Sequence, residues 1–512
     1  MIVNQFLMFT KKILCLGNND YDTDAKTFIL ADSNGTTNYG LISNADFIPN
    51  NPGYYHTTIL DIPAGGILQL AKNFDTIILL DQPVESWTHW KPLLSTYKIM
   101  MELDNQGHNT VYKDNKNIQK YKLFDNLTKK NKSFCIYPWI EKIETNGNLT
   151  LCHRSSKTIT TLSELKDWQT DTNYQKIRNS MLTGELLPDY CSVCYEYESK
   201  GIESYRQFET KDWIGKLNIN SVEELNNITH PYYYEIRLSN KCNIMCRSCK
   251  PEFSHLIEKE FKKFNIIDDQ PQSFQYSSTD IIDMSTLNKD TRVYLTGGEP
   301  TIIPEVLAFM KKCIAVGKTD FDFTMCTNGV KLSPKFLELS SHFSNLNFSF
   351  SLDGYEKIND YWRWGSEWNT VIQNAHLLQS RGHNIAINCV PGIYNVTNLH
   401  LLFEFLDKEF PYAGVYLQIN YKEMQSAYNQ PNAQAVVESM TRCQQTKIYH
   451  SDGKSNRTCI DSIYKYYSNN PTCDLENLKK FFNYNDQLDQ ARGVKLKDYI
   501  PELEECRSLI LD

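Results

Sequence analysis

The sequence lacks any apolar run long enough to cross a bilayer, which takes about 20 residues in a helix. Its first residues also lack the basic start followed by an apolar stretch that marks an export signal. Both absences argue against a membrane-spanning or secreted protein. We therefore expect a cytoplasmic chain with no membrane partner.

The chain also carries little net charge for its size, with a formal value of −8 over 512 residues. Surfaces that bind nucleic acids or anionic membranes need clustered positive charge. The acidic balance therefore argues against both as default partners, and we expect no nucleic acid.

Length and composition indicate a multidomain globular protein. The 512 residues are 41% hydrophobic and 12% aromatic, which is enough apolar material for two to four domain cores. Fifteen cysteines in a chain without an export signal favour metal binding or redox chemistry over a disulfide framework.

Three cysteines follow one another in the spacing Cys242-x3-Cys246-x2-Cys249, with no fourth cysteine close by. Three thiolates can hold three irons of a cubane cluster, which leaves the fourth iron open to chemistry. The alternative is that these are buried or stray thiols without a metal. Such short spacing in a loop favours a metal or cluster.

A second cysteine set precedes the first. Cys135 and Cys152 flank a hairpin that the dipeptide Asn146-Gly147 predicts, and Cys191-x2-Cys194 follows. Four thiolates complete a closed site for zinc or for an iron–sulfur cluster. A thioredoxin-like redox role for the C-x-x-C pair is the alternative, but no suitable βαβ pattern precedes it.

The N-terminal section, residues 1–131, is predicted to be a small α/β domain. Apolar runs at 12–17 and 74–80 read as buried strands, with helices at 64–72 and 87–103. The turn at 17–20 lacks the G-x-G-x-x-G and P-loop patterns, so a recognition or scaffold role is favoured over nucleotide binding. A polar piece rich in lysine and asparagine then indicates a linker.

Strands and helices alternate between about residues 230 and 410. This rhythm predicts a parallel sheet with right-handed crossovers, and the number of units fits an α/β fold with a partial (β/α)6 TIM-like barrel. Distinctive turns follow the strands, at the ends where such folds build active sites. The predicted strands are 232–238, 293–295, 321–326, 346–351 and 385–390, and the predicted helices are 252–264, 304–316, 334–341, 367–381 and 399–410.

Four sections result from these signals. They are the N-terminal α/β domain (1–131), a small cysteine-rich auxiliary iron–sulfur domain (132–228), the partial barrel (229–420) and a C-terminal helical extension (421–512). A helix at 162–182 is predicted within the cysteine-rich section, and one at 475–482 within the extension.

The motifs together resemble the radical S-adenosylmethionine (radical SAM) superfamily. The resemblance is carried by the three-cysteine loop after a first strand, by Gly297-Gly298-Glu299-Pro300 and by Ser351-Leu-Asp353-Gly354. The second cysteine set is similar to the auxiliary-cluster module of the SPASM and twitch subfamilies. That module usually follows the barrel, whereas here it precedes it. The aromatic residue often found before the third cysteine is replaced by Ser248.

The resemblance implies the cofactors and the reaction. Cys242, Cys246 and Cys249 would hold a 4Fe–4S cluster whose open iron binds S-adenosylmethionine. Reductive cleavage would give a 5′-deoxyadenosyl radical, which abstracts a hydrogen from a peptide or protein side chain or from a small molecule. An external electron donor would be needed. The second cysteine set would hold an auxiliary 4Fe–4S or 2Fe–2S cluster or zinc.

The resemblance also suggests which residues contact S-adenosylmethionine. The backbone of Gly297, Gly298 and Glu299 would accept the methionyl ammonium, and Ser351 and Asp353 would bind the ribose or methionyl group. Arg363 is a candidate for binding the methionyl carboxylate, and Asn328 and Asn388 are further candidates for the cofactor site. For each of these three residues, a structural role is the alternative.

Two expectations remain open at this stage. No residue stands out as a substrate acid or base, and His255 is expected to be an ordinary helix-face residue. The competing hypothesis for the whole chain is a non-catalytic iron–sulfur or zinc-binding scaffold.

Overall fold

The computed structural model describes the chain as two compact units. It covers three N-terminal strands, Leu127 and residues 131–510, apart from residues 146, 156, 200–203, 218, 267–278, 419–422, 451–453 and 470. One unit comprises Met1–Trp139 and Tyr174–Thr229, and the other comprises Ile140–Asn173 and His230–Asp512. No helix in the described part of the chain has the length and apolar character needed to cross a membrane.

The first unit contains a three-stranded parallel sheet in the order β1 (Ile13–Leu16), β2 (Thr76–Leu79) and β3 (Asn109–Tyr112). The first two strands confirm the N-terminal strands predicted from their apolar runs. The third strand was not predicted; it ends at Tyr112, where the polar piece read as a linker begins. The helices predicted at 64–72 and 87–103 and the turn at 17–20 lie outside the described residues.

The same unit contains helices α7 (Pro188–Ser199), α8 (Tyr205–Lys216) and α9 (Val222–Asn226). Arg206 on α8 is buried, and its guanidinium donates to the Phe134 carbonyl at 2.6 Å and to Glu198 at 2.5 Å. The buried guanidinium thereby links Phe134 to Glu198 on α7.

The helix predicted at 162–182 is wrong in its first half. Helix α6 begins only at Thr172 and ends at Thr183, and strand β6 (Thr158–Thr161) precedes it. Between them, Asp167 accepts hydrogen bonds from the Gln169 amide at 2.8 Å and from the Thr170 hydroxyl at 3.1 Å. Aspartate and threonine side chains that bond the nearby chain favour turns over helix.

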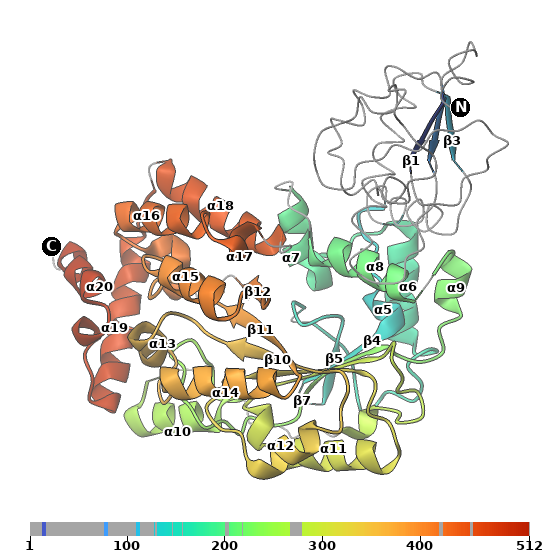
Figure 1. Ribbon diagram of the computed structural model, residues 1–512, viewed down its shortest axis with the longest axis horizontal. Helices are drawn as coiled ribbons and strands as arrows, with labels where there is room; N and C mark the ends of the chain where they lie inside the picture. Colours follow the sequence, from blue (N-terminus) through green and yellow to red (C-terminus); the bar gives the residue numbers. More distant parts are fainter. Residues whose placement is uncertain are drawn as a thin grey trace, which may run out of the picture. The chain divides into compact units, whose positions relative to one another are not determined.

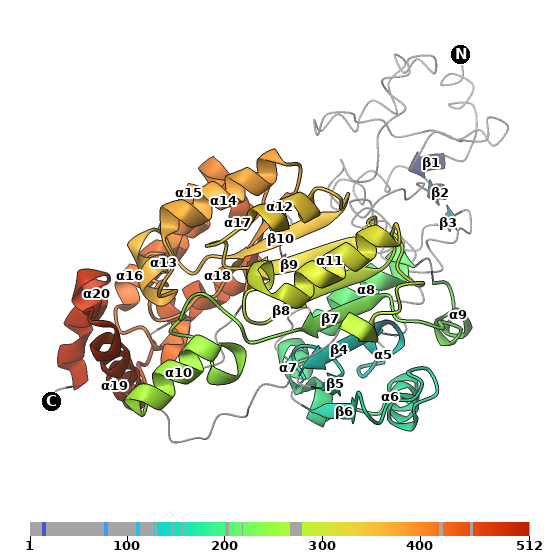
Figure 2. The same ribbon diagram turned by 90° about the horizontal axis from the view of Figure 1, so that it is seen from below.

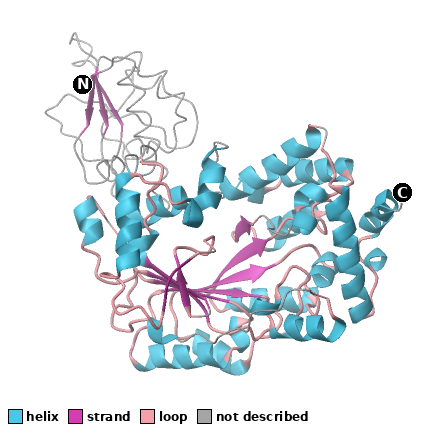
Figure 3. Cartoon of the chain, turned by 180° about the vertical axis from the view of Figure 1, so that it is seen from behind, coloured by secondary structure: helices cyan, strands magenta, loops and turns pink. Residues whose placement is uncertain are grey.

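The second unit is built on a nine-stranded sheet in the order β12-β11-β10-β9-β8-β7-β4-β5-β6. Figure 3 shows the strands in magenta, with helices around them. Strands β7 to β12 are parallel and follow sequence order. The predicted hairpin is confirmed, because β4 and β5 pair in antiparallel fashion around Gly147. The strands are β4 (Glu141–Thr145), β5 (Asn148–Thr150), β7 (Tyr233–Arg237), β8 (Arg292–Thr296), β9 (Asp322–Thr327), β10 (Leu346–Ser351), β11 (Asn384–Cys389) and β12 (Gly414–Leu417).

Alternate side chains of these strands face a single apolar core. Ile236, Leu295, Met325, Phe348 and Ile387 all belong to it. Helices α11 (Pro304–Ala315), α12 (Pro334–Ser340), α14 (Trp368–Ser380) and α15 (Leu399–Glu409) contribute the other half of that core. Figures 1 and 2 show α11, α12 and α14 along one side of the sheet. The other sheet face is polar.

The α/β class and the parallel sheet are therefore confirmed. Each predicted strand of this section agrees with the observed one to within about two residues, although the last strand, β12, was missed. The partial (β/α)6 barrel stays a prediction, because it concerns how far this sheet curves. The four-part division at residues 131, 228 and 420 also stays a prediction.

The remaining helices of this unit are α10 (His255–Phe264) and α13 (Lys357–Trp362), followed by a helical C-terminal section. That section contains α16 (Ala433–Cys443), α17 (Lys447–His450), α18 (Lys454–Ser468), α19 (Leu475–Arg492) and α20 (Pro501–Glu505). Helix α19 is ten residues longer than the predicted helix at 475–482.

Candidate active site

The three-cysteine loop lies directly after β7 and has no regular secondary structure. The Cys249 amide donates to the Cys246 carbonyl at 3.1 Å, which forms a tight turn between the second and third cysteines. The Cys242 amide donates to His255 Nδ1 at 3.2 Å. His255 lies on α10, as expected of a helix residue, and its ring also contacts the loop. Its ring fixes the start of the loop, and no spacing rule in the sequence indicates that contact.

The loop cysteines are partly buried. Burial raises the pKa of Cys242 to about 12. Burial also raises the pKa of Cys246, and the positive charge of Arg363 opposes that rise. A thiolate is the form that binds iron, so cluster assembly has to release protons from this loop. Among the described residues, no three histidine, cysteine or acidic side chains converge on a point that could hold a single metal ion.

The Gly297-Gly298 turn after β8 contacts the cysteine loop through main-chain atoms. Both glycines have positive φ angles, +82° and +54°. A Cβ atom on Gly298 would lie 2.4 Å from the Lys241 carbonyl oxygen, so only glycine fits there. The Glu299 amide donates to the same carbonyl at 2.8 Å. The two loops therefore share a backbone contact, one residue before Cys242.

The Glu299 side chain is buried and joins the turns after β8 and β9. Its carboxylate accepts from the Thr301 amide and hydroxyl at 3.1 and 2.7 Å, from the Thr327 hydroxyl at 2.8 Å and from the Asn328 amide at 2.7 Å. Burial raises its pKa, and these hydrogen bonds oppose the rise. The carboxylate therefore holds the site together and is fully engaged with protein donors.

Asn328 connects the turn after β9 to the first cysteine. Its side-chain amide donates to Asn243 Oδ1 at 2.8 Å and lies 3.9 Å from Cys242 Sγ. An amide donor directed at a ligand sulfur is one way in which a protein tunes an iron–sulfur cluster.

Arg363 lies near Cys246. The Met245 amide donates to the Trp364 carbonyl at 2.7 Å, and the Arg247 amide donates to the Trp362 carbonyl at 2.8 Å. These two bonds bracket Cys246 and Arg363, and the charge of Arg363 acts on the Cys246 thiol.

Part of the Arg363 guanidinium is hydrogen-bonded within the protein. Its Nη1 donates to Asp353 Oδ2 at 2.8 Å, and Asp353 Oδ1 accepts from the Val390 amide at 2.9 Å. Arg363 Nε is buried and has no hydrogen-bond partner in the described part of the chain. A buried donor without a partner near Cys246 fits a site for an oxygen-bearing anionic group.

Ser351 and Asn388 are directly paired in the register of β10 and β11. Both contact Cys326 on β9, with the Ser351 hydroxyl 3.5 Å and the Asn388 amide 3.7 Å from its sulfur. These residues lie on the polar face of the sheet, together with Tyr294 and Glu235. Cys326 was not predicted, because a single cysteine in an alternating strand gives no signal.

The second cysteine set is divided between the two units. Cys135, Cys191 and Cys194 belong to the first unit and are buried. Cys191 and Cys194 lie one helical turn apart on α7, and burial raises the pKa of Cys191 to about 12. Cys152 belongs to the second unit. The four-cysteine auxiliary site therefore stays a prediction.

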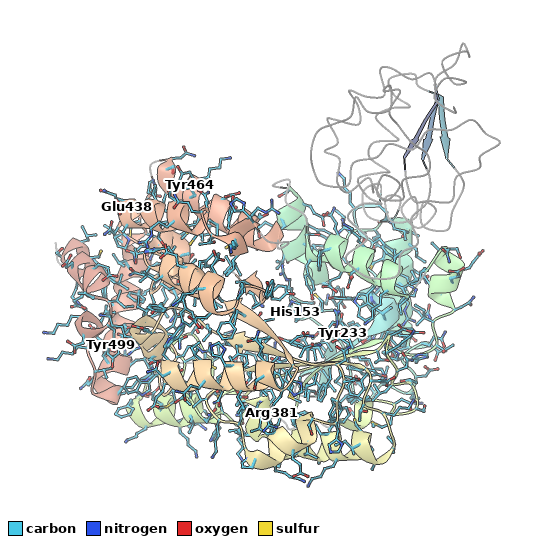
Figure 4. The ribbon with its side chains drawn as sticks, viewed as in Figure 1. His153, Tyr233, Arg381, Glu438, Tyr464 and Tyr499 are labelled. Carbon is cyan, nitrogen blue, oxygen red and sulfur yellow. The ribbon has the colours of Figure 1, made fainter. Side chains whose placement is uncertain are left out.

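The turn that carries Cys152 is tied to the polar face of the sheet. The next residue, His153, lies with its Nδ1 3.6 Å from Glu235 on β7, and Tyr233 donates to the same carboxylate at 3.4 Å. Figure 4 shows His153 and Tyr233 close together beside the sheet. Although burial disfavours a charged Glu235, its contacts with His153 and Arg237 lower its pKa overall.

Sequence comparison connects this geometry to known proteins. Residues 236–406 match the model of the radical SAM superfamily. "Molybdenum cofactor biosynthesis protein 1" of Drosophila melanogaster is 26% identical over 168 residues, which are 31% of this chain and 27% of that protein. A "GTP 3',8-cyclase" of Nostoc sp. strain PCC 7120 is 27% identical over 186 residues, which are 35% of this chain and 54% of that protein.

Solved structures show only a distant likeness. The structure of native anSMEcpe with bound AdoMet gives a TM-score of 0.32 at 16% identity, over 42% of this chain and 59% of that one. SuiB of Streptococcus suis bound to S-adenosylmethionine gives 0.30 at 16% identity, over 52% and 58%. The chain thus spans about a quarter to half of the curated relatives' length.

The family match begins within β7 and ends within α15, so it contains the three-cysteine loop, the Gly297-Gly298 turn, Asp353 and Arg363. This match to the radical SAM superfamily covers about a third of the chain and supports an iron–sulfur radical SAM enzyme.

Proposed function

We propose that this protein reductively cleaves S-adenosylmethionine and abstracts a hydrogen atom from an organic substrate. When bound, a 4Fe–4S cluster on Cys242, Cys246 and Cys249 together with S-adenosylmethionine would supply the 5′-deoxyadenosyl radical. The observation that carries the proposal is the pair of main-chain hydrogen bonds that holds Arg363 near Cys246, in the loop that the glycine turn also contacts.

The chain's own residues have distinct tasks in this proposal. Arg363, held by Asp353, offers its unpartnered Nε to the methionyl carboxylate. The glycine turn brings main-chain carbonyls close enough to accept the methionyl ammonium. Ser351, Asn328 and Asn388 lie at neighbouring strand ends and would bind the ribose or methionyl group. The Glu299 side chain positions the turns.

A peptide or protein side chain is the substrate class that we favour. It is supported by the resemblance of Cys135, Cys152, Cys191 and Cys194 to the auxiliary-cluster module of the SPASM and twitch subfamilies. In this proposal the section 132–228 holds the auxiliary cluster, and the N-terminal section 1–131 recognises the substrate. An external donor supplies the electron.

A nucleotide is the second candidate substrate, because the curated relatives include proteins named GTP 3',8-cyclase. These relatives match 31% to 35% of this chain, with 26% or 27% identity. Anaerobic incubation of the reconstituted protein with GTP and S-adenosylmethionine tests this candidate directly. A new guanine product would favour the nucleotide over the peptide.

Formation of 5′-deoxyadenosine tests the proposed reaction. Anaerobically reconstituted protein, given S-adenosylmethionine and dithionite, is expected to release 5′-deoxyadenosine and methionine in a chromatographic assay. The Cys246→Ala variant should lose that activity, whereas Cys313→Ala, which alters a buried thiol on α11, should keep it. Protein with full iron and sulfide content that releases no 5′-deoxyadenosine would instead support the non-catalytic scaffold.

A further inference from the structure

Arg247 lies within the cysteine loop, between Cys246 and Ser248, and its side chain is completely buried. Its Nε donates to the Tyr361 carbonyl at 2.9 Å, and its guanidinium lies 3.6 Å from the centre of the Tyr361 ring. A fully buried guanidinium needs several acceptors to offset its lost hydration. The remaining acceptors come from a distant part of the chain.

Helix α19 supplies those acceptors. Arg247 Nη2 donates to Asp489 Oδ1 at 2.6 Å, and Nη1 donates to Asn485 Oδ1 at 2.9 Å. The Arg247 carbonyl in turn accepts from the Tyr484 hydroxyl on α19 at 2.9 Å. Tyr361 donates its hydroxyl to Asp489 at 2.9 Å, which closes the network. Both the backbone and the side chain of one loop residue are therefore held by α19.

The same helix also fastens α10, which follows the cysteine loop. Arg492 and Glu260 form a buried bidentate pair at 2.7 and 2.8 Å. Leu488 packs in one apolar cluster with Ile257 and Phe261 of α10, and Met245 and Cys249 pack against that cluster. Helices α10 and α19 lie side by side in Figures 1 and 2.

We propose that α19 is a clamp that positions the cysteine loop for its cluster, with Asp489 and Arg247 as positioning residues. Helix α19 lies beyond residue 406, where the match to the radical SAM superfamily ends. The C-terminal extension thus completes the cofactor site. This inference rests on the proposed function only in assigning a cluster to the loop, because the contacts themselves involve protein groups alone.

The physical reason is the cost of leaving a buried charge without its partner. Loss of Asp489 leaves the Arg247 guanidinium uncompensated, and the loop can relieve that state only by moving the side chain to water. Movement of Arg247 displaces its neighbours Cys246 and Cys249. The sheet core, which contacts other helices, keeps its packing.

Thiol alkylation of the metal-free protein tests the clamp. In the Asp489→Asn variant, native-state alkylation of Cys246 and Cys249 should become at least about tenfold faster, as read by mass spectrometry. Alkylation of Cys313 in the sheet core should stay slow. The control is Asp486→Asn, which changes an exposed aspartate of α19 that pairs with Arg507 and should match the wild type. Unchanged loop rates, or a rise shared with Cys313, would overturn the proposal.

A double variant separates positioning from simple burial of charge. Arg247→Met with Asp489→Leu removes both charges, so it leaves no lone ion in the interior. We expect its loop cysteines to be alkylated faster than in the wild type, as in Asp489→Asn, while alkylation of Cys313 stays slow. Its iron content after reconstitution should fall below that of the wild type. If Cys246 and Cys249 of this double variant were alkylated as slowly as in the wild type, the ionic contact would not be what positions the loop. Because alkylation uses metal-free protein, failure of S-adenosylmethionine cleavage leaves this test intact.

Discussion

Gly298 shows how strongly one residue can determine the site. Its φ of +54° is costly for any residue with a Cβ, and a Cβ would lie 2.4 Å from the Lys241 carbonyl. Gly298→Ala should therefore lower the free energy of unfolding by about 2–4 kcal/mol, from strain and overpacking together. Urea denaturation measures this loss. The matched control is Gly382→Ala, where φ is +86° but nothing lies within 4 Å, so about 1–2 kcal/mol of strain remains. Equal losses of unfolding free energy in Gly298→Ala and Gly382→Ala would contradict the predicted clash with the Lys241 carbonyl.

His383 gives a residue-level prediction about pH. Burial lowers its pKa from the ordinary value of 6.5, although the hydrogen bond between its Nδ1 and the Leu346 carbonyl opposes that effect. Below about pH 6.5 this histidine binds a proton more readily in the unfolded chain than in the folded one. The free energy of unfolding therefore falls as the pH drops. His383→Gln should show a weaker decrease in unfolding free energy between pH 7 and pH 5. A decrease equal to that of the wild type would assign the effect to other groups.

At the scale of elements, α19 shows why its length was underestimated from the sequence. The second half of the helix buries Asn485 and Asp489, which interrupt the apolar periodicity that predicts a helix. Their polarity is explained by Arg247, 242 residues away from Asp489. Long-range pairs of this kind have no signature in the spacing of one sequence. The helix end does have one, because Gly493 adopts the left-handed conformation there.

The start of α19 can be tested through its cap. The Asp474 side chain accepts from the Glu476 and Asn477 amides at 3.0 Å each. Asp474→Ala should lower the free energy of unfolding by about 1 kcal/mol, and Asp474→Ser should restore most of it. Thermal or urea unfolding measures both. A serine variant as unstable as the alanine variant would show that the cap hydrogen bonds are not the cause.

At the scale of the whole molecule, iron content distinguishes one cluster from two. The reconstituted wild type should bind about eight irons if the auxiliary site holds a 4Fe–4S cluster, and about four if it holds zinc. Replacing Cys242, Cys246 and Cys249 by alanine should remove about four irons, and so should replacing Cys191 and Cys194. Iron and zinc analysis by mass spectrometry measures this. Unaltered iron in the Cys191/Cys194 variant would reject the auxiliary cluster.

The sequence predicted most of the sheet and part of the site. Strands β7 to β11 combine apolar residues with turn signals, so their periodicity and rhythm were sufficient. The three cysteines and the glycine turn were recognisable by spacing. His255 and Cys326 were missed, because their roles arise from loop packing and from neighbouring strands that only the tertiary structure brings together.

Strand β4 has a further consequence for any attempt to dissect the chain. It pairs in parallel with β7, the strand that leads into the cysteine loop, and thereby gives β7 a neighbour on the side away from β8. A fragment starting at residue 229 would leave β7 as a bare sheet edge whose amides and carbonyls invite pairing with other molecules. We expect such a fragment to self-associate. The hairpin that precedes residues 236–406 thus protects the strand that leads into the three-cysteine loop.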